Sequence, residues 1–441
     1  MESRRGGRGV GVCTAAMALC TLSLGAMAPN KARADAEVDP LPTYAFAENA
    51  QPIEGGATSA DGPQLKRGTT YRDSLGPGQE LFYWVDLDDA SSAYVFATAV
   101  PDPASTVSHG DGIDAVLMDR AGKECHRAQT TKFGFRQAHP VADVAVRRFQ
   151  EDGECQRAGT YYVKIRRVET TGEEAHDRAP WPIELRYLRE PAPSGAVVGS
   201  PPPSAAWPSA SPAPPSDRPQ PRTGGTGFND ARAVDTGVWT DRLLPGQTRF
   251  YRIPLDWGRQ VSIDAELAKS TMTKDYGYAP YGLAVELYNP ARIPVVRKHT
   301  RYDGEQALAA FGPTAPADYQ NRFAFEDPVR AMCLSGWYYL AVTLDREVGD
   351  FTSGSVPLTL RTRLSGERTS GPGYREDATS AGFGLSARDR SAAREGLTPE
   401  QAADSSSMKV LATSSFSVGT LLLLGLGAWT WAARRARLRS G

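Results

Sequence analysis

The chain contains two blocks of about 140 residues that repeat one another, and this duplication limits the folds open to it. Three motifs recur in the same order and at similar spacing, which indicates two domains built on one plan. The matched segments are Leu75-Gly-Pro-Gly-Gln79-x-x-Phe82-Tyr83 with Leu244-Pro-Gly-Gln247-x-x-Phe250-Tyr251, Gly159-Thr-Tyr161-Tyr162-Val163 with Gly336-Trp-Tyr338-Tyr339-Leu340, and Pro182-Ile183 with Pro357-Leu358.

Apolar and polar residues alternate within both blocks. In one run Val261, Ile263, Ala265 and Leu267 are separated by polar residues, and Val163 and Ile165 are spaced in the same way. A period of two places one set of side chains in a core and the other toward solvent, as in a half-buried strand. Short strands of this kind, separated by turn residues, predict an all-β fold with a β-sandwich in each block. The turn sequences are Gly76-Pro77-Gly78, Pro245-Gly246, Arg120-Ala121-Gly122 and Asn289-Pro290.

These motifs resemble those of the bacterial pre-peptidase C-terminal domains, which are small secreted sandwiches of jelly-roll type attached to exported proteases and other surface proteins. The resemblance implies two tandem copies of that fold and an accessory or targeting role, with no peptidase domain attached. Block two departs in its middle, because the run Gly282–Asn289 lacks both aspartates of the equivalent hairpin in block one. The matching segments of block one are Gly78…Phe82-Tyr83, Asp114-Ala-Val-Leu117-Met-Asp119-Arg-Ala-Gly122, Gly159-Thr-Tyr161-Tyr162 and Ile183-Glu-Leu185.

Both ends of the chain carry apolar segments. Three arginines, an uncharged run from Val10 to Ala28 and small residues near Ala34 are typical of a secretory signal peptide, cleaved after Ala28 or Ala34. The run from Val410 to Ala433 would cover about 36 Å as a helix, enough to span a bilayer. Arginines follow it at once, so we expect the C-terminus to be cytoplasmic and the blocks to lie outside the cell membrane.

The resulting domain organisation has seven parts. Proline and serine dominate the stretch between the blocks, and Gly, Ser and Arg dominate the one that precedes the apolar run. We predict a signal peptide (1–34), a first sandwich (50–190), a Pro-rich linker (191–227), a second sandwich (228–365), a flexible stalk (366–408), a transmembrane helix (409–433) and a basic tail (434–441).

Charge and cysteine content narrow the possible functions. The formal net charge is −1, which gives no electrostatic footprint for nucleic acid. In an oxidising compartment Cys125 and Cys155 are expected to pair within the first sandwich. Cys333 is left over, either as a buried free thiol before a core strand or as half of an intermolecular disulfide.

Residue patterns for catalysis are missing from the sequence. None of the five histidines forms His-Glu-x-x-His, and there is neither a Gly-x-Ser-x-Gly elbow nor a phosphate-cradling loop. We therefore expect a protein that is not an enzyme and that needs no cofactor. Asp86, Asp88, Asp111 and Asp114 could supply oxygen ligands to Ca²⁺, or could instead mark turns and strand ends.

A second candidate site is an insertion from Ser270 to Gly282. It places Tyr276, Tyr278 and Tyr281 among glycine and proline. These tyrosines could form a recognition surface, or could pack the loop onto its own domain. The sequence thus predicts a membrane-anchored binding or accessory module that contacts an envelope protein or a cell-wall polymer. An extracytoplasmic sensor or an accessory subunit of an exported protease system is the alternative.

Overall fold

The computed structural model describes residues 41–125, 130–150, 153–170, 177–195, 207–210, 213, 215–405 and 426. Strands dominate this part of the chain, and they form four sheets. The predicted all-β class is therefore confirmed. The predicted signal peptide, most of the transmembrane helix and the basic tail lie outside the described residues. Among the residues that are described, no helix is long and apolar enough to cross a membrane.

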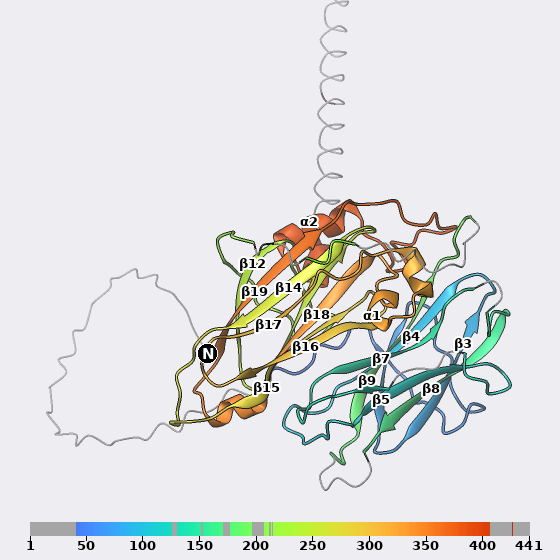
Figure 1. Ribbon diagram of the computed structural model, residues 1–441. Helices are drawn as coiled ribbons and strands as arrows, with labels where there is room; N and C mark the ends of the chain where they lie inside the picture. Colours follow the sequence, from blue (N-terminus) through green and yellow to red (C-terminus); the bar gives the residue numbers. More distant parts are fainter. Residues whose placement is uncertain are drawn as a thin grey trace, which may run out of the picture. The chain divides into compact units, whose positions relative to one another are not determined.

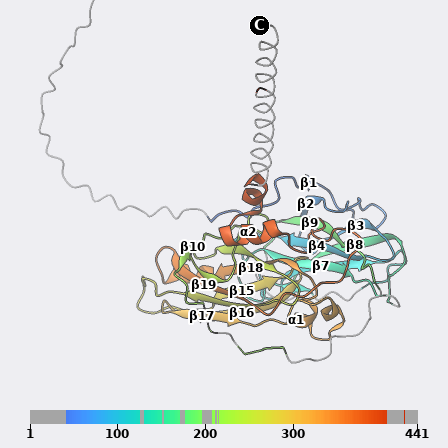
Figure 2. The ribbon, with the colours of Figure 1, turned by 90° about the horizontal axis from the view of Figure 1, so that it is seen from above.

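The first block forms two sheets. One has the order β1-β2-β9-β4-β7, seen in succession in Figure 2, and the other has the order β3-β8-β5-β6. The strands are β1 (Gln51–Pro52), β2 (Thr70–Leu75), β3 (Glu80–Leu87), β4 (Ser92–Ala99), β5 (Gly112–Met118), β6 (Thr131–Lys132), β7 (Val141–Arg147), β8 (Gly159–Val168) and β9 (Trp181–Glu190).

The second block has the same plan. Its sheets have the orders β10-β12-β19-β14-β17, labelled in part in Figure 1, and β11-β13-β18-β15-β16. The strands are β10 (Gln220–Pro221), β11 (Arg232–Ala233), β12 (Gly237–Leu243), β13 (Thr248–Leu255), β14 (Gln260–Leu267), β15 (Ala279–Tyr288), β16 (Pro294–Tyr302), β17 (Ala307–Phe311), β18 (Gly336–Leu344) and β19 (Val356–Ser365). The helices are η1 (Tyr319–Phe323), α1 (Asp327–Arg330), η2 (Arg346–Asp350) and α2 (Ala387–Glu395).

Each pair of sheets encloses its own core, as the alternation predicted. Val261, Ile263, Ala265 and Leu267 of β14 are fully buried, while the polar residues that alternate with them are half-exposed. Val163 and Ile165 of β8 are buried in the same way in the first sandwich. Apart from the short strands β1, β10 and β11, the strands pair antiparallel, and their crossed order in two packed sheets is that of a double-sheet jelly roll.

The two sandwiches share details beyond strand order. Tyr83 on β3 donates its hydroxyl proton to Asp73 on β2 over 2.7 Å, and Tyr251 on β13 donates to Asp241 on β12 over the same distance. In both cases a glycine amide also donates to that carboxylate. Because these contacts involve side chains at equivalent places in the strand order, the two halves are equivalent in side-chain detail as well as in topology.

The predicted disulfide is confirmed. Cys125 and Cys155 are bonded, and their Cα atoms lie 5.5 Å apart. Tyr161 donates to the backbone carbonyls of Cys155 and Arg157, over 2.9 and 2.8 Å, which ties the disulfide loop to β8. Cys333 is free and fully buried, as expected for a thiol that precedes a core strand, here β18.

The sandwiches meet along a seam, formed by the outer faces of one sheet from each. Tyr94 and Phe96 of β4 point away from the first core and pack against Leu334 and Phe383. Ala142 of β7 packs with outward-facing apolar residues of β13, β15 and β18: Phe250, Tyr288 and Ala341. Strands β4 and β7 are therefore buried on both faces.

The structure differs from the flexible stalk expected over 366–408. As far as residue 405, this segment packs on the sandwiches instead of extending from them. Phe383 and Ala393 are buried, and the guanidinium of Arg390 on α2 donates to Asp256 over 2.5 Å. A capping box at Ser386 starts the helix. The polar composition of the segment did not indicate this packing, because only a few apolar residues provide the contact area.

Parts of the expected linker, residues 191–227, also join the fold. Ala192 is buried, and Pro193 forms a bridge with Tyr374 of the C-terminal segment. At the other end Gln220–Pro221 form β10, which pairs in parallel with β12. The second sandwich thus begins before residue 228.

Candidate interaction surface

Most of the predicted recognition loop lies between β14 and β15, with Tyr281 on β15 itself, and its tyrosines are exposed. The exposed fractions are 70% for Tyr276, 47% for Tyr278 and 38% for Tyr281. The rings of Tyr276 and Tyr278 meet edge to face, with centroids 6.0 Å apart. These side chains share a surface instead of packing inward onto their own domain.

The loop is held in place from beneath. The amide of Thr273 donates to the carbonyl of Phe351 over 2.9 Å, and Met272 forms a bridge with Thr352. Phe351, which follows η2, is almost fully buried and contacts the backbone at Gly277 so closely that a Cβ there would lie 2.3 Å from the Cβ of Phe351. A fixed backbone lowers the entropy lost when an exposed side chain binds a partner.

Two residues of the edge strand β16 complete this surface. The guanidinium of Arg301 lies 4.9 Å from the ring centroid of Tyr278, and the ring of His299 lies 4.7 Å from that of Tyr281. Both residues are exposed. Being two positions apart, they project from the same side of the strand. We define the aromatic surface as Tyr276, Tyr278, Tyr281, His299 and Arg301.

The first sandwich supports one edge of the aromatic surface. Phe135 stacks on Tyr281 with centroids 6.0 Å apart, and on its other side it stacks on His139 at 4.7 Å. Burial lowers the pKa of His139, although nearby Glu286 acts in the opposite direction. The imidazole is thus held mainly neutral, as a packing group behind the surface.

The sequence identified the tyrosines of this surface and missed His299, Arg301 and Phe135. The spacing of His299 and Arg301 was the available signal, since residues two positions apart share one face of a strand. No local pattern connects Phe135 with a loop that lies almost 150 residues further along the chain, because the two meet only across the seam.

The four aspartates proposed as Ca²⁺ ligands do not come together. Asp86 lies opposite Thr160 near the start of β8, and Asp114 pairs with Arg166 near the end of that strand. Six residues of strand separate these places by about 20 Å. A single ion therefore cannot bind all four carboxylates.

Each of these aspartates has partners in the protein. Asp86 accepts from Gln64 and Thr160, Asp111 accepts from the amides of Ser108 and Thr170, and Asp114 pairs with Arg166 over 2.6 Å. Among the described ranges there is no cluster of three His, Cys, Asp or Glu side chains that could hold a metal ion.

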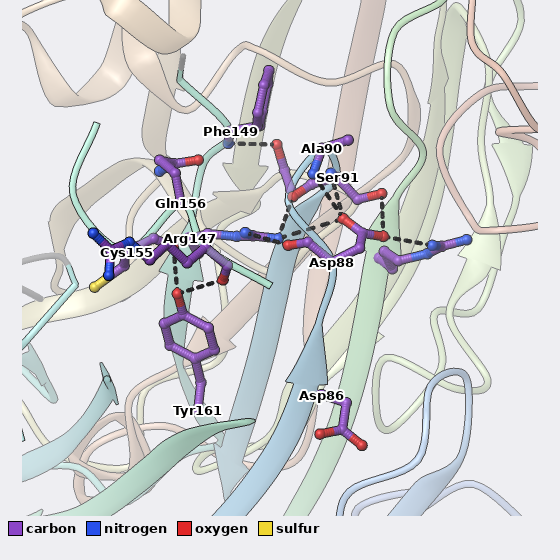
Figure 3. A network of polar contacts seen from close by, with 12 residues as sticks. Asp86, Asp88, Ala90, Ser91, Arg147, Phe149, Cys155, Gln156 and Tyr161 are labelled. Carbon is purple, nitrogen blue, oxygen red and sulfur yellow. Dashed lines mark hydrogen bonds and ion pairs between the residues drawn. The ribbon is translucent and has the colours of Figure 1, made fainter. Parts of the chain in front are cut away.

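Asp88 is the centre of a polar network at the turn after β3 (Figure 3). Its carboxylate accepts from the amides of Ala90 and Ser91, over 3.0 and 2.7 Å, and from Arg189 over 2.7 Å. Arg147 donates to the backbone carbonyls of Asp88 and Ser91. Partial burial acts to raise the pKa of Asp88, but these hydrogen bonds outweigh it and lower the pKa to about 2. The charged carboxylate fixes the turn that joins β3 to β4.

Comparisons with known proteins find likenesses in structure and none in sequence. No protein family matches the chain by sequence, and no curated protein matches it. Among solved structures, the pre-peptidase C-terminal domain of a collagenase from Bacillus anthracis is similar over 32% of this chain and 98% of that domain, with 15% identity and a TM-score of 0.16. It belongs to the family that the sequence motifs resemble, and the likeness extends over about one sandwich.

Two longer likenesses are to proteins that contain two modules of one type. The CUB1-EGF-CUB2 region of human MASP-1/3 is similar over 67% of this chain and 99% of that region, with 10% identity and a TM-score of 0.17. The tandem CBM51 modules of a family 98 glycoside hydrolase from Streptococcus pneumoniae are similar over 67% and 83%, with 8% identity and a TM-score of 0.17. At such identities and TM-scores, none of these likenesses carries an argument about function.

Proposed function

We propose that this protein is a non-enzymatic binding module held outside the cell membrane by residues 409–433, and that its aromatic surface contacts a protein of the cell envelope. On this proposal its two sandwiches are tandem copies of the pre-peptidase C-terminal type. The observation that carries the proposal is the exposed set of tyrosines on a fixed loop, beside Arg301.

The composition of the surface favours a protein partner. Tyrosine and arginine are the residue types that most often dominate binding energy at protein–protein contacts. Tyrosine presents a large apolar ring together with a hydroxyl group, and it loses little conformational entropy when it is bound. A contiguous group of such side chains on a solvent-exposed face is uncommon without a binding role.

Crosslinking in intact cells tests this function. The full chain would be purified after crosslinking, and the proteins that accompany it would be identified by mass spectrometry. One envelope protein should be recovered in a stoichiometric amount with the wild-type chain, and much less of it with a Tyr276→Ser/Tyr278→Ser variant.

A matched control is Phe325→Ser, since Phe325 is an 87% exposed aromatic residue outside this surface. It should leave recovery unchanged. If instead the wild-type chain brings down no protein and sediments with isolated cell wall, the partner is a wall polymer and the proposed protein contact is wrong.

A further inference from the structure

A second site, the seam pocket, opens between the two sandwiches at the other end of β16. Its volume is about 470 Å³. The first sandwich contributes Lys132 of β6 and Arg148, which follows β7, while the second contributes Arg297 of β16 and Arg330 of α1. A pocket of this size suits a small ligand or one residue of a larger one.

The charges around the seam pocket are unequal. Four cationic side chains line it, whereas its acidic lining is Asp143 and Asp327. Arg297 is paired with Glu286, and Arg330 is paired with Asp327. Asp143 accepts from the amide of Ala115 over 2.7 Å and from the Thr131 hydroxyl over 3.1 Å, so its carboxylate is already engaged inside the first sandwich.

Lys132 and Arg148 are the cations that remain. Within the described part of the chain neither has an ion-pair partner, and the buried Nε of Arg148 has no hydrogen-bond partner. Arg148 also lies close enough to Arg330 for their like charges to interact. Burial lowers the pKa of Arg330, and the charge of Arg148 lowers it further. Two guanidinium groups that repel across a pocket are stabilised when an anion lies between them.

We propose that the seam pocket binds an oxyanion, a phosphate or carboxylate group of a ligand, on Arg148 and Lys132 and beside Arg330. The planar guanidinium of Arg148 can donate two parallel hydrogen bonds to such a group, and Lys132 adds a point charge from β6, in the other sheet of the same sandwich. Both sandwiches contribute to the site, so it exists only when the seam is formed. The proposal is independent of the aromatic surface, which lies near the Tyr302 end of β16, about 20 Å from its Pro294 end.

Calorimetric titration of the full chain in neutral detergent tests this site. Inorganic pyrophosphate and citrate would be titrated separately at low ionic strength, with each of the variants Arg148→Gln and Lys132→Gln beside the wild type. Loss of a charge-assisted hydrogen bond should weaken binding by about tenfold. The anion that binds more tightly identifies the ligand group as phosphate or carboxylate.

The matched control is Arg120→Gln, an exposed arginine in the turn after β5, at the opposite end of that strand from Lys132. It should bind like the wild type. The proposal is overturned if neither anion binds, if both pocket variants bind as the wild type does, or if Arg120→Gln loses affinity equally. Should Arg148→Gln fail to fold, the comparison of Lys132→Gln with Arg120→Gln decides the question alone.

Discussion

Arg322 of the second sandwich donates to Glu190 of the first over 2.8 Å, and the two side chains are 0% and 1% exposed. The hydroxyls of Tyr94 and Tyr374 donate to the same carboxylate, over 3.1 and 2.8 Å. Burial acts to lower the pKa of Arg322, but the charge of Glu190 outweighs it and raises that pKa. A buried ion pair with these hydrogen bonds holds the two sandwiches in one arrangement.

We predict that Arg322→Met strongly destabilises the protein, because it leaves Glu190 buried without its cation. The expected loss is about 3–5 kcal/mol of unfolding free energy. Urea denaturation of the purified protein measures it. Lys269→Met serves as the control, since Lys269 and Glu305 form a pair at 2.6 Å with 70% and 65% of their side chains exposed. It should cost far less than Arg322→Met, because water screens an exposed pair. Equal effects of the two variants would contradict a structural role for the buried pair.

The tyrosine–aspartate contacts that the two sandwiches share predict equal costs. Tyr83→Phe and Tyr251→Phe each remove one hydroxyl donor from a carboxylate, and each should cost about 1.5–3 kcal/mol. Tyr276→Phe, at a 70% exposed position, should cost almost nothing in the same denaturation experiment. A large difference between the first two variants would show that the two contacts are not energetically equivalent.

Removing the disulfide should weaken the first sandwich. The bond closes a separation of 30 residues, and the chain-entropy account predicts a loss of about 3–4 kcal/mol for a Cys125→Ser/Cys155→Ser variant. Denaturation with and without reductant measures this loss. Reductant should destabilise the wild type and leave the variant unchanged. If reductant left the unfolding transition of the wild type unchanged, that result would argue against the bond.

The free energy of unfolding should fall as the pH rises from about 5 to 7, because of the buried carboxyl group of Asp143. Burial raises the pKa of Asp143 to about 7, from 3.8 for an ordinary aspartate. Between these values the folded state holds a proton that the unfolded state has lost, so each pH unit removes up to about 1.4 kcal/mol. Asp345, whose pKa burial raises to about 6, acts in the same direction.

An Asp143→Asn variant separates this contribution from the others. It cannot ionise, so its unfolding free energy should depend less steeply on pH than that of the wild type, measured by urea denaturation at pH 5, 6 and 7. The neutral His139 acts in the opposite sense, because its lowered pKa makes acidification destabilising. An unchanged slope in the variant would mean that Asp143 is ionised in the folded protein across this range.

The sequence predicted the elements of the fold better than their assembly. Period-two alternation located β8 and β14, and the repeated Phe-Tyr motif located β3 and β13, because these strands have one face in a core and the other facing outward. The seam was missed. In β4 the run Ser92–Ala99 is buried along its whole length. Such a run indicates that a strand is covered on both faces, but it does not indicate which other segment covers the second face.

Only part of the candidate site was predicted, because some of its contacts join segments that are far apart in the sequence. Exposed tyrosines are conspicuous in a glycine-rich insertion, so Tyr276 and Tyr278 could be found locally. Arg301 reaches Tyr278 from a neighbouring strand and Phe135 reaches Tyr281 from the other sandwich. Contacts of that range depend on strand pairing and on packing across the seam, which a single sequence does not specify. The seam pocket was missed because its cations come from four separate segments.

Photo-crosslinking from the aromatic surface tests the central claim most directly. A photoreactive phenylalanine would replace Tyr276 in the full chain in living cells, and in a second strain it would replace Phe325, which is even more exposed. The account predicts one discrete crosslinked envelope protein from position 276 and none from position 325. No product at 276, or the same products from both positions, would contradict the assignment of this surface as the partner contact.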